Sequence, residues 1–174
     1  MQYHDFDILA PALLQQTVNE AEMLGSAVWL WMQSKEHRNY PLHVLATMLL
    51  PAIKTGQFIL AVEKGKPVFY LSWAQFSEEA EQRYVTNPLY TIPEADWQSG
   101  GRIWILDWIA PGGNTWEMRN LTRLLFKNNC VRTLYHRGNV RGLRVIEFRG
   151  ADVPPETAKA WFARHPVKRD AQPN

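Results

Sequence analysis

Apolar residues recur at helical spacing over two stretches near the N-terminus. In residues 11–32 they return about every three to four positions, which predicts one helix. A second helix is expected over residues 41–53, beginning at a proline and kinked at Pro51. Residues 33–40 between them are polar, and a helix boundary is expected near Tyr40 because the residue before a proline avoids helical geometry.

The pattern then changes to a period of two. Residues 57–63 and 67–74 flank the turn at residues 64–66, which predicts a β-hairpin. Ser77 and the two glutamates after it predict the start of a short helix, since acidic residues suit the positive end of a helix. Residues 102–110 are apolar on both faces, which is typical of a central strand covered on each side.

The last third of the chain again mixes helix and strand patterns. Asn114 and Glu117 have the spacing of a capping box, which predicts a helix beginning there. Residues 130–136 and 143–149 predict a second hairpin, and residues 155–163 a final helix. This order of elements predicts an α/β (α+β) fold, with a mixed central β-sheet flanked by helices.

Length and composition fit one domain. The chain has 174 residues, of which 46% are hydrophobic and 21% are charged, and it contains no repeat or linker. We expect a single domain over residues 1–174, with an N-terminal helix or extension at 1–23 and a C-terminal helix and tail at 151–174. The lone Cys130 excludes an internal disulfide and a cysteine-based zinc site. No long apolar run or signal peptide is visible, so a cytoplasmic location is expected.

Positive charge is concentrated in one segment. The formal net charge is only +2, yet residues 119–149 carry eight arginines and lysines against the single acid Glu147. Such asymmetry is typical of a docking face for an acidic partner, although a solvated face without a partner explains it equally well. Nucleic acid is a less suitable partner because no RNA-binding signature is present.

Asp107 is the most informative polar position. Strict strand alternation places it on the same face as Ile103, Ile105 and Ile109. A carboxylate buried among isoleucines needs a hydrogen-bond donor or a cation, and an imidazole would serve. The competing explanation is an aspartate that accepts hydrogen bonds from backbone N–H groups at the end of its strand.

His37 lies in the polar stretch between the two predicted N-terminal helices. Ser34 is three residues before it, so both side chains would share one face of a helical turn. Histidine titrates near neutrality, and an aspartate can orient its ring for acid–base catalysis. A surface or capping histidine is the alternative. The residues alone indicate a His/Asp acid–base site and name no substrate.

Several segments of the chain, many of them containing tryptophan, stand out in a fixed order. They are LGSAVWLWMQS at 24–34, HRNYP at 37–41, LPAI at 50–53, QF at 57–58, PV at 67–68, SWA at 72–74, DWQSG at 96–100 and WILDWIAP at 104–111. Together they resemble the signature of the RTX toxin-activating lysine acyltransferases, the hemolysin-activation family. The resemblance covers about residues 24–150. Gly112 and Gly113 depart from it, since many relatives have an aromatic residue there, and the segment before residue 24 is longer than usual.

The resemblance implies a reaction and its participants. A fatty acyl group would pass from acyl-acyl carrier protein to the ε-amino groups of internal lysines of an RTX protoxin, in the bacterial cytoplasm. The fold would be similar to GNAT-type N-acyltransferases, with no metal and no cofactor besides the carrier as co-substrate. The family's catalytic histidine falls on His37, its aspartate on Asp107 and an implicated serine on Ser34. His37 would act as general base oriented by Asp107, or else form a covalent acyl-histidine.

The resemblance also suggests binding residues and partners. Relatives are thought to dimerise, so a homodimer is one expectation. Two other functions stay open: a non-catalytic, chaperone-like partner of a secreted protein, and a CoA-dependent GNAT-type enzyme acting on a small amine. Part of a docking face for the acidic carrier is expected at Arg132, Arg137, Arg141 and Arg144. Trp29, Trp31, Trp73 and Trp104 are candidates to line an acyl-chain groove, although core packing is the role favoured for most of them.

Overall fold

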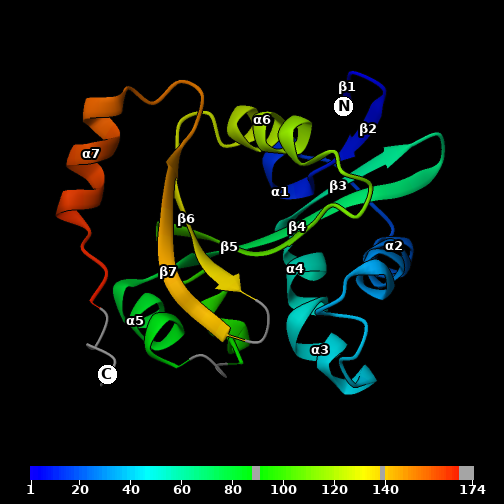
Figure 1. Ribbon diagram of the computed structural model, residues 1–174, viewed down its shortest axis with the longest axis horizontal. Helices are drawn as coiled ribbons and strands as arrows, with labels where there is room; N and C mark the ends of the chain where they lie inside the picture. Colours follow the sequence, from blue (N-terminus) through cyan, green and yellow to red (C-terminus); the bar gives the residue numbers. More distant parts are fainter. Residues whose placement is uncertain (88–90, 138–139, 169–174) are drawn as a thin grey trace.

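A mixed seven-stranded sheet forms the centre of the protein (Figure 1). The computed structural model describes residues 1–87, 91–137 and 140–168, and the side chains at positions 136–143 lie outside the described part. Strands neighbour one another in chain order, and every pair is antiparallel except β5–β6. The strands are β1 (Gln2–Tyr3), β2 (Phe6–Leu9), β3 (Phe58–Glu63), β4 (Lys66–Phe76), β5 (Arg102–Ile109), β6 (Cys130–Arg137) and β7 (Val140–Arg149).

Helices cover both faces of the sheet, as the expected fold class requires. Met118 and Leu121 of α6 pack on one face, and α1 lies beside them (Figure 1). Leu30 of α2, Ile53 of α4 and Ala80 of α5 pack on the other face. The helices are α1 (Pro11–Leu14), α2 (Glu20–Gln33), η1 (Leu42–Val44), α3 (Leu45–Met48), α4 (Leu50–Thr55), α5 (Glu78–Thr86), η2 (Glu94–Asp96), α6 (Thr115–Leu125) and α7 (Pro155–Arg164).

The N-terminal region differs from the prediction. The single helix expected over residues 11–32 is two helices, because α1 ends at Gln15 in a left-handed conformation with φ 54°. Asn19 then starts α2, since its side chain accepts hydrogen bonds from two backbone N–H groups of the first turn. The β1–β2 hairpin ahead of these helices was not expected, because both strands are too short to give a clear alternation.

The second predicted helix is also interrupted. Residues 42–55 form η1, α3 and α4 in succession, and Pro51 lies in the first turn of α4 rather than at a kink within one helix. A proline there removes no helical hydrogen bond, because first-turn N–H groups have no partner within the helix. The break therefore falls before Pro51, at Leu49, where the backbone leaves α3.

The other predicted elements are confirmed in place and type. Both hairpins form, and Ser77 caps α5 by accepting a hydrogen bond from the backbone N–H of Ala80. Helix α6 begins one residue after Asn114, but the Asn114 side chain makes no capping hydrogen bond, so the capping box itself was wrong. Among the described residues, no helix is long and apolar enough to cross a membrane.

One extra residue in β5 changes the face to which its C-terminal half points. Trp73 of β4 pairs with Ile105, while the preceding residue, Ser72, pairs with Asp107. Two consecutive residues of β4 therefore face two residues of β5 that are separated by Leu106. This arrangement is a β-bulge, which interrupts the alternation of side chains along the strand.

The bulge corrects the orientation expected for Asp107. Ile103 and Ile105 belong to the core beneath α6, and Trp108 packs against that core. Ile109 belongs instead to the core beneath α2, and Asp107 points to that same side. The expected common face of Asp107 with Ile103 and Ile105 was wrong, because alternation at period two holds only in a strand without a bulge.

Candidate active site

His37 is held in a tight turn immediately after α2. The helix ends at Ser34, whose backbone is extended with φ −82° and ψ 128° and whose N–H still donates to the carbonyl of Trp31 at 3.0 Å. The carbonyl of Ser34 then accepts a hydrogen bond from the N–H of Arg38 at 3.1 Å. This turn folds the chain back, so His37 lies over the end of the helix it follows.

The imidazole of His37 is bonded at both nitrogens. Nδ1 lies 2.7 Å from Oγ of Ser34, and Nε2 lies 3.1 Å from Oδ1 of Asp107. The His37 and Asp107 side chains are only 11% and 6% exposed. The structure thus brings together three residues that the sequence had singled out, from a turn and from a strand 70 residues later.

Two aromatic rings pack beside the imidazole. The ring centroid of Trp31 lies 4.8 Å from that of His37, and the ring of Tyr40 lies 5.5 Å away at an edge-on angle. Trp31 and Tyr40 also contact each other, with centroids 5.7 Å apart. These contacts limit rotation of the imidazole, so the ring stays aligned with Asp107 as well as shielded from water.

Asp107 has a second partner that sequence reasoning missed. The hydroxyl of Ser72 donates a hydrogen bond to Oδ2 of Asp107 at 3.1 Å, and Ser72 is fully buried. Each carboxylate oxygen therefore has a side-chain partner, which differs from the alternative of an aspartate bonded only to backbone groups. A lone serine among the apolar and aromatic residues of the run PVFYLSWA, at 67–74, was the available signal.

The hydrogen-bond partners determine which imidazole nitrogen is basic. A carboxylate accepts hydrogen bonds, so Nε2 of His37 carries the hydrogen and Nδ1 keeps a free electron pair. The hydroxyl of Ser34 then donates to Nδ1. A serine, a histidine and an aspartate in this order form the arrangement of hydrolytic triads, with the two ring nitrogens exchanged. Such a site can accept a proton from a nucleophile at the Ser34 side.

A buried tyrosine lies near the carboxylate. Burial, and secondarily the negative charge of Asp107, raises the pKa of Tyr70 well above its ordinary value. Tyr70 is therefore a neutral phenol at the pH of a cell, and it adds no charge to the site. Within the described ranges, no group of three or more His, Cys, Asp or Glu side chains is placed to hold a metal ion.

The four tryptophans expected to line an acyl-chain groove do not lie together. Trp31 packs on His37, and Trp29 is 56% exposed on α2. Trp73 packs under α6 on the opposite face of the sheet, against Phe126, while Trp104 is fully buried in a third cluster. The expectation of one groove lined by all four is therefore wrong, and core packing accounts for Trp73 and Trp104.

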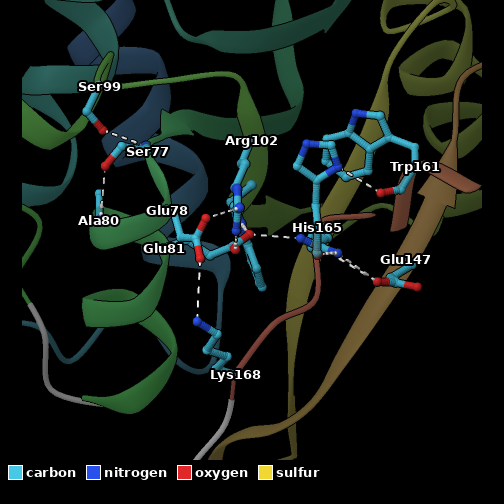
Figure 2. A network of polar contacts seen from close by, with 12 residues as sticks. Ser77, Glu78, Ala80, Glu81, Ser99, Arg102, Glu147, Trp161, His165 and Lys168 are labelled. Atoms are coloured by element: carbon cyan, nitrogen blue, oxygen red, sulfur yellow. Dashed lines mark hydrogen bonds and ion pairs between the residues drawn. The ribbon is translucent and has the colours of Figure 1, made fainter. Parts of the chain in front are cut away.

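Arg132 is buried in a polar network, not exposed on a docking face. Its side chain is 1% exposed, and its guanidinium bonds Glu81 at 2.9 Å and Glu147 at 3.1 Å. Arg102 also pairs with Glu81 (Figure 2). The carbonyl of His165 accepts a further hydrogen bond from Arg132. The expectation that Arg132 contacts a carrier protein is wrong. The alternation of side chains along β6 directs Arg132 into the protein, where it pairs with Glu81 of α5.

The remaining positions of the expected docking face are only partly described. Arg144 is exposed on β7, and its guanidinium lies 4.9 Å from the ring centroid of Tyr135. The side chains of Arg137 and Arg141 lie outside the described residues. Cys130 is a buried thiol, and burial raises its pKa, which agrees with an inert residue rather than a nucleophile.

Comparison with known proteins identifies the family. The RTX toxin acyltransferase family, HlyC, matches residues 16–149. Protein-lysine myristoyltransferase RtxC of Kingella kingae is 37% identical, covering 82% of this chain and 84% of the relative. Leukotoxin-activating lysine-acyltransferase LtxC of Aggregatibacter actinomycetemcomitans is 36% identical, covering 84% and 87%. Protein-lysine myristoyltransferase HlyC of Escherichia coli is 35% identical, covering 83% and 84%.

A solved structure resembles the chain more distantly. It is an acetyltransferase of the GNAT family from Streptococcus agalactiae, with 17% identity, a TM-score of 0.36 and 80% coverage of each chain. The family match extends over most of the chain and includes the Ser34, His37 and Asp107 positions. The chain therefore belongs to the RTX toxin acyltransferase family.

Proposed function

We propose that the protein transfers a fatty acyl group from an acyl carrier protein to the ε-amino groups of internal lysines in an RTX protoxin, in the bacterial cytoplasm. The observation that carries this proposal is the contact of His37 with both Asp107 and Ser34 in a largely buried site. The names of the relatives, which describe lysine acylation and leukotoxin activation, support the choice of acceptor.

Lysine needs a base before it can react. Its amine has an ordinary pKa of about 10.4, so at neutral pH it is mostly protonated and cannot attack a thioester. Nδ1 of His37 is the basic atom, and it accepts a hydrogen bond from the hydroxyl of Ser34. In our proposal the amine gives its proton to Oγ of Ser34 while Ser34 gives its own to Nδ1. Asp107 then stabilises the imidazolium through Nε2.

Acyl transfer follows from this proton movement. The amine nitrogen forms a bond to the thioester carbonyl carbon, and the carbon–sulfur bond breaks when the tetrahedral intermediate collapses. The second proton of the nitrogen passes to bulk water, which leaves a neutral amide. The imidazolium returns its proton to the departing thiolate of the carrier, which restores neutral His37. Trp31 and Tyr40 exclude water from the ring, so they favour the amine over water as the nucleophile.

The test is acyl transfer with purified components. Palmitoyl-acyl carrier protein and a protoxin fragment are incubated with the protein, and the mass of lysine-containing peptides is measured. We expect a palmitoyl-sized gain, and His37→Ala should lower the rate by about 100-fold or more. His43→Ala is the matched control, because His43 is exposed on η1.

Other outcomes distinguish the competing functions. Transfer from acetyl-CoA to a small amine, without transfer from the carrier, would support a CoA-dependent enzyme. No transfer from any donor, with stable binding to the protoxin fragment, would support a chaperone-like partner. Full activity of His37→Ala would contradict the proposed mechanism. The expected homodimer stays a prediction, which analytical ultracentrifugation tests.

A further inference from the structure

We propose that Ser72 is a positioning residue for acyl transfer: its hydroxyl holds the Asp107 carboxylate in the orientation that bonds His37. The inference rests on the proposed function, because it assigns a role to a residue that supports the same base. The Ser72 hydroxyl donates to Asp107, whose other oxygen bonds the imidazole, so Ser72 would act on His37 through Asp107.

Each of the two oxygens of the Asp107 carboxylate has its own hydrogen-bond partner. Oδ1 lies 3.1 Å from Nε2 of His37, and Oδ2 accepts the Ser72 hydroxyl at 3.1 Å. These are the side-chain hydrogen bonds of Asp107 within the described part of the chain. The terminal torsion of an aspartate is broad, so a single partner would leave the carboxylate plane poorly defined. A second donor fixes the plane and keeps Oδ1 directed at the ring.

Backbone pairing holds the serine in place. Ser72 and Asp107 are directly opposed in the β4–β5 ladder, at the first pair after the bulge. Directly opposed residues of an antiparallel pair carry side chains on the same face, about 5 Å apart, which suits a short hydroxyl donor. Ser72 is fully buried, so water does not compete for its hydroxyl.

Two buried tyrosines near Asp107 add no charge to the Asp107–His37 pair. Tyr70 of β4 and Tyr84 of α5 also lie within the influence of the carboxylate. Burial, followed by the charge of Asp107, raises the pKa of both tyrosines, so both stay neutral through the working range of pH. Ser72 also interacts with Tyr70, but that phenol stays neutral, so a change at Ser72 should alter charge only at the Asp107–His37 pair among these groups.

A purely structural role is the competing explanation. In that explanation Ser72 does no more than fill space at a buried strand position, and Ser72→Ala would leave catalysis unchanged. We expect instead that Ser72→Ala lowers kcat about tenfold with little change in KM, because the serine does not touch either substrate. Ser72→Thr keeps the hydroxyl and should restore most of the rate. If the added methyl group prevents folding, Ser72→Cys keeps the volume with a weaker donor and should give an intermediate rate.

The control removes a buried hydroxyl elsewhere. Thr122 is 1% exposed on α6, and its hydroxyl donates to the carbonyl of Met118 at 2.7 Å, under the other face of the sheet. Thr122→Ala should leave kcat unchanged. An equal loss of kcat in Ser72→Ala and Thr122→Ala would indicate a general loss of packing and would overturn the positioning role.

Two further measurements separate this inference from the proposed function. In the Asp107→Asn background, adding Ser72→Ala should cost less than about twofold, since the serine acts through the carboxylate. The ¹⁵N chemical shifts of His37 should report an Nε2–H ring in the wild-type protein and a mixture of tautomers in Ser72→Ala. Normal kcat and an unchanged tautomer in Ser72→Ala would refute the role of Ser72 alone. No acyl transfer by the wild-type protein would refute the proposed function instead.

Discussion

The hydroxyl of Ser34 lies 2.7 Å from Nδ1 of His37, on the nitrogen that Asp107 leaves unoccupied. A substrate proton can therefore reach the basic nitrogen only through Ser34 or after Ser34 rotates away. This relationship gives the serine a specific place in the proposed proton transfer. It also distinguishes two mechanisms, since a serine at this position can relay a proton or attack the thioester itself.

Ser34→Ala tests the relay. Removal of the hydroxyl leaves Nδ1 without its partner, so we expect kcat to fall about 10- to 100-fold while His37 keeps its bond to Asp107. Ser34→Thr keeps a hydroxyl and should retain more activity than the alanine variant. The measurement is the rate of lysine acylation followed by mass spectrometry.

The wild-type protein distinguishes direct attack from a covalent route. Incubation with acyl-acyl carrier protein in the absence of protoxin should leave the mass of the protein unchanged if the amine attacks the thioester directly. A stoichiometric acyl adduct on Ser34 or His37 would contradict direct attack and establish an acyl-enzyme.

Asp107→Asn tests the choice of tautomer. The amide of the variant can present its NH₂ group to Nε2 of His37, which then becomes the acceptor and moves the ring hydrogen to Nδ1. The ring would lose its basic nitrogen on the Ser34 side. We expect kcat to fall about 10²- to 10⁴-fold with a small change in KM. Near-normal turnover would assign Asp107 to folding rather than to catalysis.

Arg144→Glu tests the exposed part of the basic segment. If Arg144 helps to bind the acidic carrier, the charge reversal should weaken carrier affinity several-fold and reduce its dependence on salt. Lys66→Glu makes the same change of charge at an exposed position in the β3–β4 hairpin and serves as control. Equal affinities of both variants and the wild type, measured by titration calorimetry at two salt concentrations, would remove Arg144 from the docking face.

Arg132→Met tests the buried network shown in Figure 2. Loss of the guanidinium leaves Glu81 with Arg102 as its remaining cation and removes the contact to Glu147. Breaking one side of a buried ion pair costs about 3–5 kcal/mol, so the free energy of unfolding should fall by about that amount. Urea unfolding followed by circular dichroism measures it, with Arg144→Met as the exposed control. Unchanged stability would show that the ion pair with Arg102 is sufficient to compensate the charge of Glu81.

Local pattern was sufficient for much of the fold. Alternating residues around the turn at 64–66 predicted the first hairpin, and the apolar run of 102–110 predicted the central strand. Ser77 and the two glutamates after it predicted a helix start because acidic residues suit the positive end of a helix, and α5 begins there. The short strands before residue 10 were missed, since pairing holds them in the sheet and local preference does not: β2 pairs with β3, and β1 pairs with β2.

Residue chemistry pointed to Ser34, His37 and Asp107, but not to Ser72 or to the geometry of the site. A histidine in a polar turn and an aspartate in an apolar strand each lacked a partner in the sequence, and that need pointed to both. The contact between them depends on Leu106 being an extra residue, because the register with β4 turns Asp107 toward α2. No local pattern in β5 reveals a bulge, since the bulge exists only relative to its neighbouring strand.

The amino-acid order by itself indicated most of the element types, the family resemblance and the choice of Ser34, His37 and Asp107. Only the tertiary structure decided that Asp107 faces the imidazole, that Ser72 supports it, and that Arg132 is buried against Glu81. The physical reason is that periodicity and hydrogen-bonding need are properties of each segment. Strand register and burial are properties of how segments pack together.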